Sequence, residues 1–147
     1  MNVKRSFVHL ILASIFFLLA SIHFYWALGG EWGIERTLPA NEQGMKILDP
    51  TVFDSIIVGT GLSLFGMIYL FSQRIFQNRF LAFAWNIVLW IIPLIFLLRA
   101  IGEFHYVGFF KSIKGTDFAF LDTVFYSPLC LGIALLGLIV VMRKRRK

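Results

Sequence analysis

The sequence is poor in charge and in cysteine. Charged residues make up 15% of the 147-residue chain, whereas about a quarter is typical of a soluble domain. The single cysteine, Cys130, excludes both a disulfide within the chain and an intramolecular Cys–Cys redox pair. The longer polar segments contain no Walker, GxSxG or HExxH motif, so none of the reactions that those motifs support is indicated.

Apolar residues make up 59% of the chain, and 17 residues are phenylalanine. They form four long runs, at residues 7–28, 52–71, 80–98 and 124–142. Each run has about the 20 residues that a helix needs to cross the ~30 Å hydrocarbon core of a bilayer. A β-barrel is disfavoured because these runs do not alternate between polar and apolar residues. The sequence therefore predicts an all-α membrane protein: a four-transmembrane-helix bundle in which residues 1–147 form a single membrane domain.

The basic residues are unevenly distributed along the chain. The net charge is +6, and five of the 14 basic residues form the C-terminal sequence RKRRK. No aromatic residue interleaves this tail, which is typical of an anchor beside anionic lipid and not of a nucleic-acid site. Basic residues also dominate the N-terminus and residues 72–79, whereas residues 29–51 and 99–123 mix both signs. The positive-inside rule then predicts that both termini and residues 72–79 are cytoplasmic.

The first apolar run has two interpretations. It follows a basic start and ends near the sequence ALG, as a signal peptide does. However, its apolar part is longer than a usual h-region, and bulky aromatic residues precede ALG. We therefore expect a retained membrane span, with cleavage as the alternative.

Small residues recur at helical spacing in the second and fourth runs, where they predict close helix–helix contacts. These residues are Ser55, Gly59, Ser63 and Gly66 in the second run and Ser127, Cys130, Ala134 and Gly137 in the fourth. Cys130 is therefore interpreted as a packing residue and not as a nucleophile.

Polar and aromatic side chains from all four runs fall on the predicted outer side of the membrane. We expect them to line a polar pocket there, because ionisable groups at membrane depth often mark functional sites. The candidate ligand-binding residues are His23, Tyr25, Trp26, Trp32, Arg99, Glu103, His105, Asp122 and Tyr126. An arginine at this depth needs a carboxylate, and the available acids are Glu103, Asp54 and Asp122. Arg99 and Glu103 are four residues apart, so they can pair on one helix face if the third helix continues through Glu103.

A structural interpretation of the same residues stays open. In it, Arg99 reaches the interface with Glu103 as its counter-ion, His23 is a packing histidine, and the tryptophans belong to the aromatic belt. A haem or metal held by His23 and His105 is disfavoured, because no ligand spacing such as HxxxH accompanies them. We therefore expect no metal site, and the sequence assigns no cofactor.

The segment 108–122 is too apolar for an ordinary solvent loop, since it includes Phe109, Phe110, Phe118 and Phe120. We expect this segment to lie at the outer interface as a short amphipathic piece. From there it would cover the polar pocket.

Two stretches, HFYWALGGEWG and RAIGEFHYVGFFKSIKGTDFAFLDTVFYSPLCLGIAL, carry a resemblance that spans nearly the whole chain. In them the chain resembles a family of small bacterial four-helix integral membrane proteins of unknown function. The matching positions are His23, Tyr25, Trp26, Gly29, Gly30 and Trp32 in the first stretch, and Arg99, Gly102, Phe104, Gly108, Asp122, Tyr126, Ser127 and Pro128 in the second. The resemblance implies a fold and a membrane location but no activity.

The function predicted from the sequence is binding of a small molecule or a lipid headgroup in the outer pocket, with Arg99 holding an anionic or polar group. One alternative is a small integral-membrane enzyme that uses His23, Glu103 or Asp122 for acid–base chemistry. Another is an accessory subunit or a homo-oligomer that uses the small-residue faces to bind a membrane partner. Beyond the lipid bilayer no partner is assigned, and nucleic acid is not expected.

Overall fold

The computed structural model of the chain describes residues 3–72 and 78–145. Arg74 and the last two residues of the basic tail lie outside the described residues. The described part is helical, apart from the connecting segments and an isolated β-bridge between Ala40 and Lys46. Its helices are, in chain order, α1 (Val3–Ala27), α2 (Ile34–Thr37), α3 (Val52–Phe71), α4 (Arg79–Ile101), α5 (Asp117–Leu121), the π-helical turn η1 (Asp122–Tyr126) and α6 (Ser127–Arg145).

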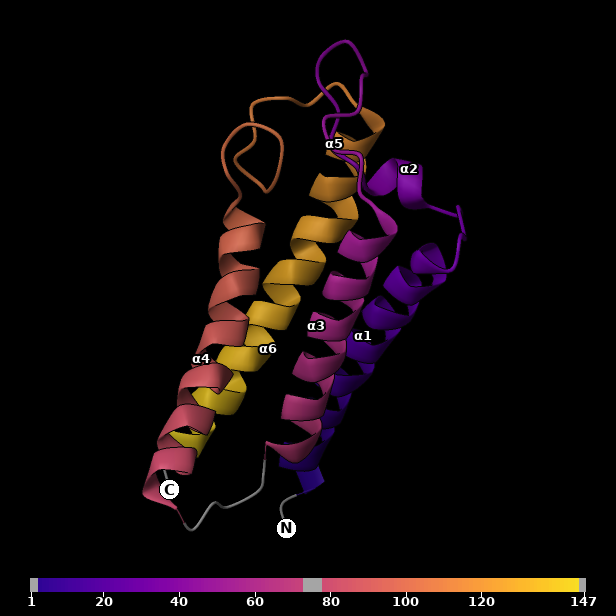
Figure 1. Ribbon diagram of the computed structural model, residues 1–147. Helices are drawn as coiled ribbons and strands as arrows, with labels where there is room; N and C mark the ends of the chain where they lie inside the picture. The colour runs from indigo at the N-terminus through magenta and orange to yellow at the C-terminus, as the bar shows by residue number, and fades with distance from the viewer. Residues whose placement is uncertain (1–2, 73–77, 146–147) are drawn as a thin grey trace.

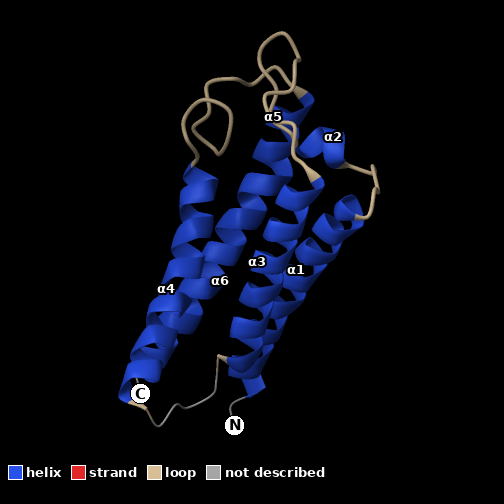
Figure 2. Ribbon diagram, viewed as in Figure 1, coloured by secondary structure: helices blue, strands red, loops and turns tan. Residues whose placement is uncertain are grey.

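The four long helices lie side by side, and neighbours in the chain are antiparallel (Figure 1). The start of α1 and the end of α6 lie at the same end of the molecule, which we call the terminal end. The connecting segments 28–51 and 102–116 lie at the opposite end, which we call the loop end, together with α2 and α5 (Figure 2). The chain therefore runs the length of the bundle four times and returns to the end where it began.

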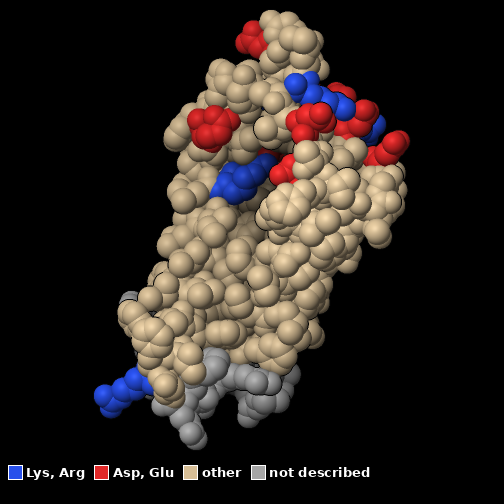
Figure 3. Space-filling model, in the orientation of Figure 1, with Lys and Arg blue, Asp and Glu red and all other residues tan. Residues whose placement is uncertain are grey.

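Four helical stretches are long and apolar enough to cross a membrane: Phe7–Ala27, Val52–Phe71, Arg79–Ile101 and Asp117–Arg143. On the face shown in Figure 3, charged side chains gather towards the two ends, and the surface between them is uncharged. Such a surface suits the hydrocarbon core of a bilayer. These features confirm the predicted all-α fold, and the chain is a multi-pass membrane protein.

The third and fourth spans extend further towards the loop end than their apolar runs. The predicted third span, 80–98, stops before Arg99, whereas α4 includes this residue. The predicted fourth span, 124–142, begins after Asp122, whereas the helical stretch begins at Asp117. Hydropathy ends a span at a charge, but Arg99 and Asp122 pair with each other and so remain within the helices.

Aromatic side chains join the helices in the core. Helix contacts are most extensive within two pairs, α1 with α3 and α4 with α6. The fully buried Phe16 of α1 stacks on Tyr69 of α3 with 5.7 Å between ring centroids, and it meets Phe96 of α4 edge-on at 5.3 Å. An aromatic pair of this kind contributes about 0.5–1.5 kcal/mol beyond the burial of its area. Phe16 therefore helps to hold the two helix pairs together as one bundle.

Glycines allow the helices to approach closely at several points. Gly59 and Gly66 of α3 each face a phenylalanine ring of α1, and a Cβ atom there would lie 3.0 or 3.1 Å from the nearest ring carbon. Gly137 of α6 faces the hydroxyl of Tyr69 and the Cβ of Pro93, and an added Cβ would lie 2.7 and 2.9 Å from them. Three of the small residues thus lie at helix contacts, as their spacing predicts.

We expect Gly137→Ala to destabilise the bundle by about 1–3 kcal/mol, which is the usual cost of overpacking a core. The matched control is Gly132→Ala in the same helix, where an added Cβ meets nothing within 4 Å and alanine has the higher helix propensity. The free energy of unfolding, measured by SDS titration of the protein in mild detergent, compares the two variants. Equal stability of the two would contradict the close contact at Gly137.

Candidate functional site

A buried carboxylate, that of Asp122, organises the loop end of the bundle. It is fully buried, and one of its oxygens, Oδ1, accepts a hydrogen bond of 2.8 Å from Arg99 Nη2. The other oxygen, Oδ2, accepts from the backbone N–H of Gly108 at 2.8 Å and from Lys111 Nζ at 3.0 Å. We call Arg99, Lys111 and Asp122 the ion cluster. It joins α4, the segment 102–116 and η1.

A π-helical turn carries Asp122 into the bundle. In η1 the backbone N–H of Ser127 donates to the carbonyl of Asp122, five residues earlier. Pro128 follows, and it has no N–H to donate. In an ordinary α-helical turn its ring would collide with the carbonyl of Val124, so the wider turn accommodates the proline. π-Turns of this kind are frequent at functional sites.

The expected pairing of Arg99 with Glu103 is wrong. Helix α4 ends at Ile101, and Gly102 follows it with a φ of 90°, so Glu103 lies beyond the helix and is exposed. Its carboxylate accepts hydrogen bonds from three successive backbone N–H groups, those of His105, Tyr106 and Val107. Glu103 therefore shapes the loop, and the partner of Arg99 is the distant Asp122.

Two glycines fold the loop back against the end of α4. Gly102 and Gly108 have φ angles of 90° and 91°, which favour glycine. A Cβ at either position would collide with the backbone of the other part of the loop. The return is completed by the backbone N–H of Phe109, which donates to the carbonyl of Ala100 at 2.9 Å. This close approach directs the Gly108 N–H at Asp122.

Lys111 is a site residue that the sequence analysis missed. Its side chain is buried, and Nζ donates to the Gly108 carbonyl at 3.0 Å, to Asp122 Oδ2 at 3.0 Å and to Thr123 Oγ1 at 2.7 Å. An ammonium has three donors, so Lys111 is fully satisfied. The available signal was its position directly after Phe109 and Phe110, because a charge among apolar residues needs a partner.

The ion cluster contains more positive than negative charge. Two cations share the single carboxylate of Asp122. The side chain of Arg99 is 33% exposed, yet its Nη1 atom is shielded and has no hydrogen-bond partner within residues 3–72 and 78–145. Figure 3 shows basic surface in a hollow near the loop end of this face, below acidic groups. The cluster therefore holds a charged donor that no described residue satisfies.

The four candidates near the end of α1 form a separate aromatic group. His23 Nδ1 lies 2.9 Å from the carbonyl of Leu19, and its ring meets that of Trp26 edge-on at 4.9 Å. Trp26 Nε1 donates to the carbonyl of Trp32 at 2.9 Å. The ring of Tyr25 packs against Gly30, and Tyr25 and Trp32 line a shallow apolar depression with Ser21 and Ile22. These contacts are typical of an interfacial aromatic belt.

The remaining candidates are engaged elsewhere. His105 Nδ1 lies 3.0 Å from Ser112 Oγ, and the ring of His105 meets that of Tyr106. The hydroxyl of Tyr126 donates to the carbonyl of Arg36 at 3.4 Å, which links η1 to α2. Of the nine candidates, the structure thus brings Arg99 and Asp122 together in the ion cluster. Within the described ranges, no group of three His, Cys, Asp or Glu residues could hold a metal ion.

Comparison with known families matches residues 16–137 to a family described as proteins of unknown function, DUF3995. The chain belongs to this family. The match bears out the resemblance to a family without an assigned function, and it covers the whole ion cluster. No curated protein and no solved structure matches the chain.

We expect Asp122→Asn to destabilise the protein by about 3–5 kcal/mol, because removing one partner leaves buried charges uncompensated. The amide cannot neutralise Arg99 and Lys111, although it fills the same space. The free energy of unfolding in detergent measures the loss.

The matched control is Glu35→Gln, which breaks the exposed pair of Glu35 and Lys46, 2.9 Å apart. The hydrogen bond and the charge of Lys46 lower the pKa of Glu35. Both side chains face water, where such a pair contributes little to stability. Similar stability of the Asp122 and Glu35 variants would mean that the ion cluster does not hold the loop end together.

Proposed function

We propose that this membrane protein binds an anionic phosphate group through Arg99 at the loop end, with a phospholipid headgroup as the expected source. The supporting observation is the Nη1 atom of Arg99, a shielded charged donor with no partner among the described residues. A buried donor left without a partner costs about 1–3 kcal/mol, and more when the group is charged. An anion that accepts from Nη1 removes this cost and balances the second cation of the cluster.

In the proposed site, Lys111 and Arg99 have different roles. Lys111 uses its donors on Gly108, Thr123 and Asp122, and so it holds the carboxylate in position. Asp122 in turn fixes the Nη2 side of the Arg99 guanidinium. The rest of that planar fork remains for a ligand, and a guanidinium binds phosphate oxygens in pairs.

The depth of Arg99 also supports a lipid phosphate. Arg99 lies 20 residues after Arg79, the first residue of α4. At 1.5 Å per residue, about 30 Å of helix separates them. This length matches the hydrocarbon thickness of a typical bilayer, about 30 Å. If Arg79 lies at one interface, Arg99 reaches the headgroups of the opposite leaflet.

The alternative functions receive less support. His23, Glu103 and Asp122 make no hydrogen bond or ion pair with one another in the part of the chain that the structure describes, so shared acid–base chemistry is not favoured. The carboxylate of Glu103 already accepts from the loop backbone. An accessory-subunit role remains a prediction. It would be supported if another membrane protein co-purified with the native chain and also with variants of Arg99.

We expect Arg99→Gln to weaken the binding of phosphatidylglycerol by roughly ten- to a hundredfold, because a charge-assisted hydrogen bond contributes about 1.5–3 kcal/mol. Asp122 keeps its bonds to Lys111 and Gly108 in this variant, so the fold is retained. Native mass spectrometry of delipidated protein in mild detergent, titrated with the lipid, measures the affinity. Arg36→Gln is the control, since Arg36 is an exposed arginine at the same end.

Titrations with inorganic phosphate and with phosphatidylcholine identify the ligand. Saturation by phosphate alone, with no preference for the lipid, would make the ligand a free anion. Equal binding of phosphatidylglycerol and phosphatidylcholine would show that net headgroup charge is not recognised. If Arg99→Gln and Arg36→Gln bind phosphatidylglycerol and phosphate as the native protein does, Arg99 is not a binding residue.

We further propose that the terminal end faces the cytoplasm and the loop end faces outside. The support is the distribution of Lys and Arg: the last five residues of the chain are all basic, whereas the longer loop 29–51 has Arg36 and Lys46 as its basic residues. All of these residues lie in short loops or close to the ends of the spans, where the positive-inside rule applies.

The topology predicts opposite labelling of two cysteines introduced into a Cys130→Ala background. A membrane-impermeant maleimide applied to intact cells is expected to label Glu42→Cys, which is exposed in the loop 29–51. The same reagent is expected to label a cysteine appended after Lys147 only once the cells are permeabilised. The reverse pattern would invert the orientation.

A further inference from the structure

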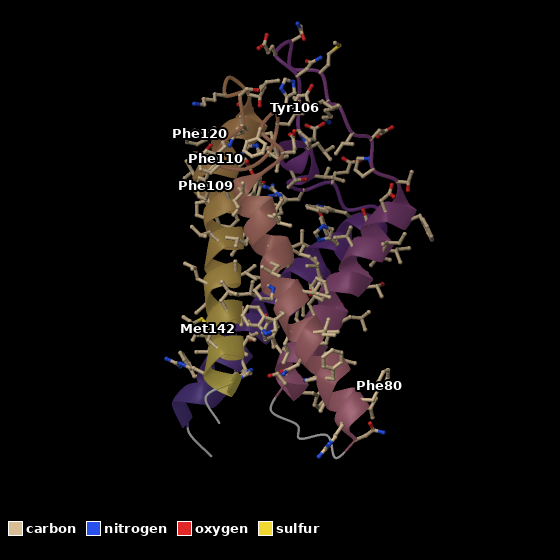
Figure 4. The ribbon with its side chains drawn as sticks, turned by 90° about the vertical axis from the view of Figure 1, so that its left-hand side faces the viewer. Phe80, Tyr106, Phe109, Phe110, Phe120 and Met142 are labelled. Carbon is tan, nitrogen blue, oxygen red and sulfur yellow. The ribbon has the colours of Figure 1, made fainter. Side chains whose placement is uncertain are left out.

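The loop end displays a group of phenylalanine rings that the bundle does not cover. Phe104, Phe110 and Phe120 are 62%, 65% and 65% exposed, and Phe109 is also exposed. Figure 4 shows Phe109, Phe110 and Phe120 grouped on one side of the molecule, at the top of α5 and the adjoining loop. The rings of Phe104 and Phe110 lie 6.4 Å apart. We call these four residues the phenylalanine patch.

The backbone holds Phe104 in a costly conformation. Its φ is 70°, in the left-handed region, and it is the one non-glycine residue with positive φ in the described part of the chain. This conformation costs about 1–2 kcal/mol for an L-residue. The ring gains little from packing within the chain because most of it is exposed. Strain that the fold maintains in this way often serves a function.

The loop that carries the patch is firmly held. The backbone N–H of Ser112 donates to the Phe104 carbonyl at 3.1 Å, and that of Ile113 donates to the His105 carbonyl at 3.0 Å. Lys111, directly after Phe110, is anchored in the ion cluster. The exposed rings are therefore presented in a defined arrangement.

The patch continues the apolar surface of the membrane-spanning helices. Val124 is exposed and lies four residues after Phe120, about one turn further along the fourth span. Met142, which is also exposed, lies below the patch on the left-hand side of Figure 4, towards the terminal end. An apolar surface continuous with a lipid-facing one is itself suited to lipid.

We propose that the phenylalanine patch inserts into the headgroup–acyl boundary of the leaflet at the loop end, with phospholipid as its occupant. The segment 102–116 is then an interfacial anchor, with its rings towards lipid and the exposed Lys114 towards water. This inference uses the exposed rings and not the free donor of Arg99, so it stands or falls separately from phosphate binding.

The experiment uses the full chain in phosphatidylcholine vesicles, with Cys130→Ala to remove the native thiol. An environment-sensitive fluorophore is attached to Phe110→Cys and, as a control in the same loop, to Lys114→Cys. We expect the label at position 110 to emit at shorter wavelength and to be quenched several-fold more strongly by lipids spin-labelled near the headgroup. The label at position 114 is expected to be quenched preferentially by aqueous iodide.

Three results would overturn the inference. Iodide quenching of the label at position 110 equal to that at position 114 would place the patch in water. Equal quenching of both labels by lipid would mean that the loop has no preferred lipid face. Protection of position 110 from both quenchers would mean that protein, such as a second copy of the chain, covers the rings.

Discussion

The loop end of this protein depends on the carboxylate of Asp122. A buried charge in a membrane-spanning helix is costly unless opposite charges and hydrogen bonds compensate it. Arg99, Lys111 and the Gly108 N–H supply that compensation from α4 and from the loop that follows it. The requirement therefore couples three segments that are separate in the sequence, and it fixes the position of the loop 102–116 against the end of α4.

Length and hydropathy were sufficient to predict the fold, because a bilayer demands about twenty apolar residues per helix. The same reasoning failed at the ends of the spans. It stopped the third span before Arg99 and began the fourth after Asp122, although both residues lie within the helical stretches. A hydropathy profile treats each charge as a cost to its own segment, whereas these two charges neutralise each other across helices.

The site was predictable as a set of residue types but not as a set of contacts. Arg99 and Asp122 stand out in the sequence because they border the third and fourth apolar runs on the predicted outer side. Their pairing could not be read from spacing, since 23 residues separate them. The spacing of four residues instead suggested that Arg99 pairs with Glu103. That pairing requires α4 to continue through Glu103, but the helix ends at Ile101, before Gly102. The role of Lys111 depends on a loop conformation that no periodic pattern encodes.

The ion cluster and the phenylalanine patch are structurally coupled, because the adjacent residues Phe110 and Lys111 belong to the patch and to the cluster, respectively. Phe110 faces outwards and Lys111 is buried, so a single backbone conformation displays the ring and delivers the ammonium to Asp122. If lipid covers the rings as proposed, its binding favours the same loop conformation that brings Lys111 to Asp122. In the proposed placement, the cluster also holds the guanidinium of Arg99 at the depth of the headgroups. An apolar replacement of the whole cluster could be equally stable, but it would lose this coupling between the loop, the lipid surface and a positive charge held at the interface.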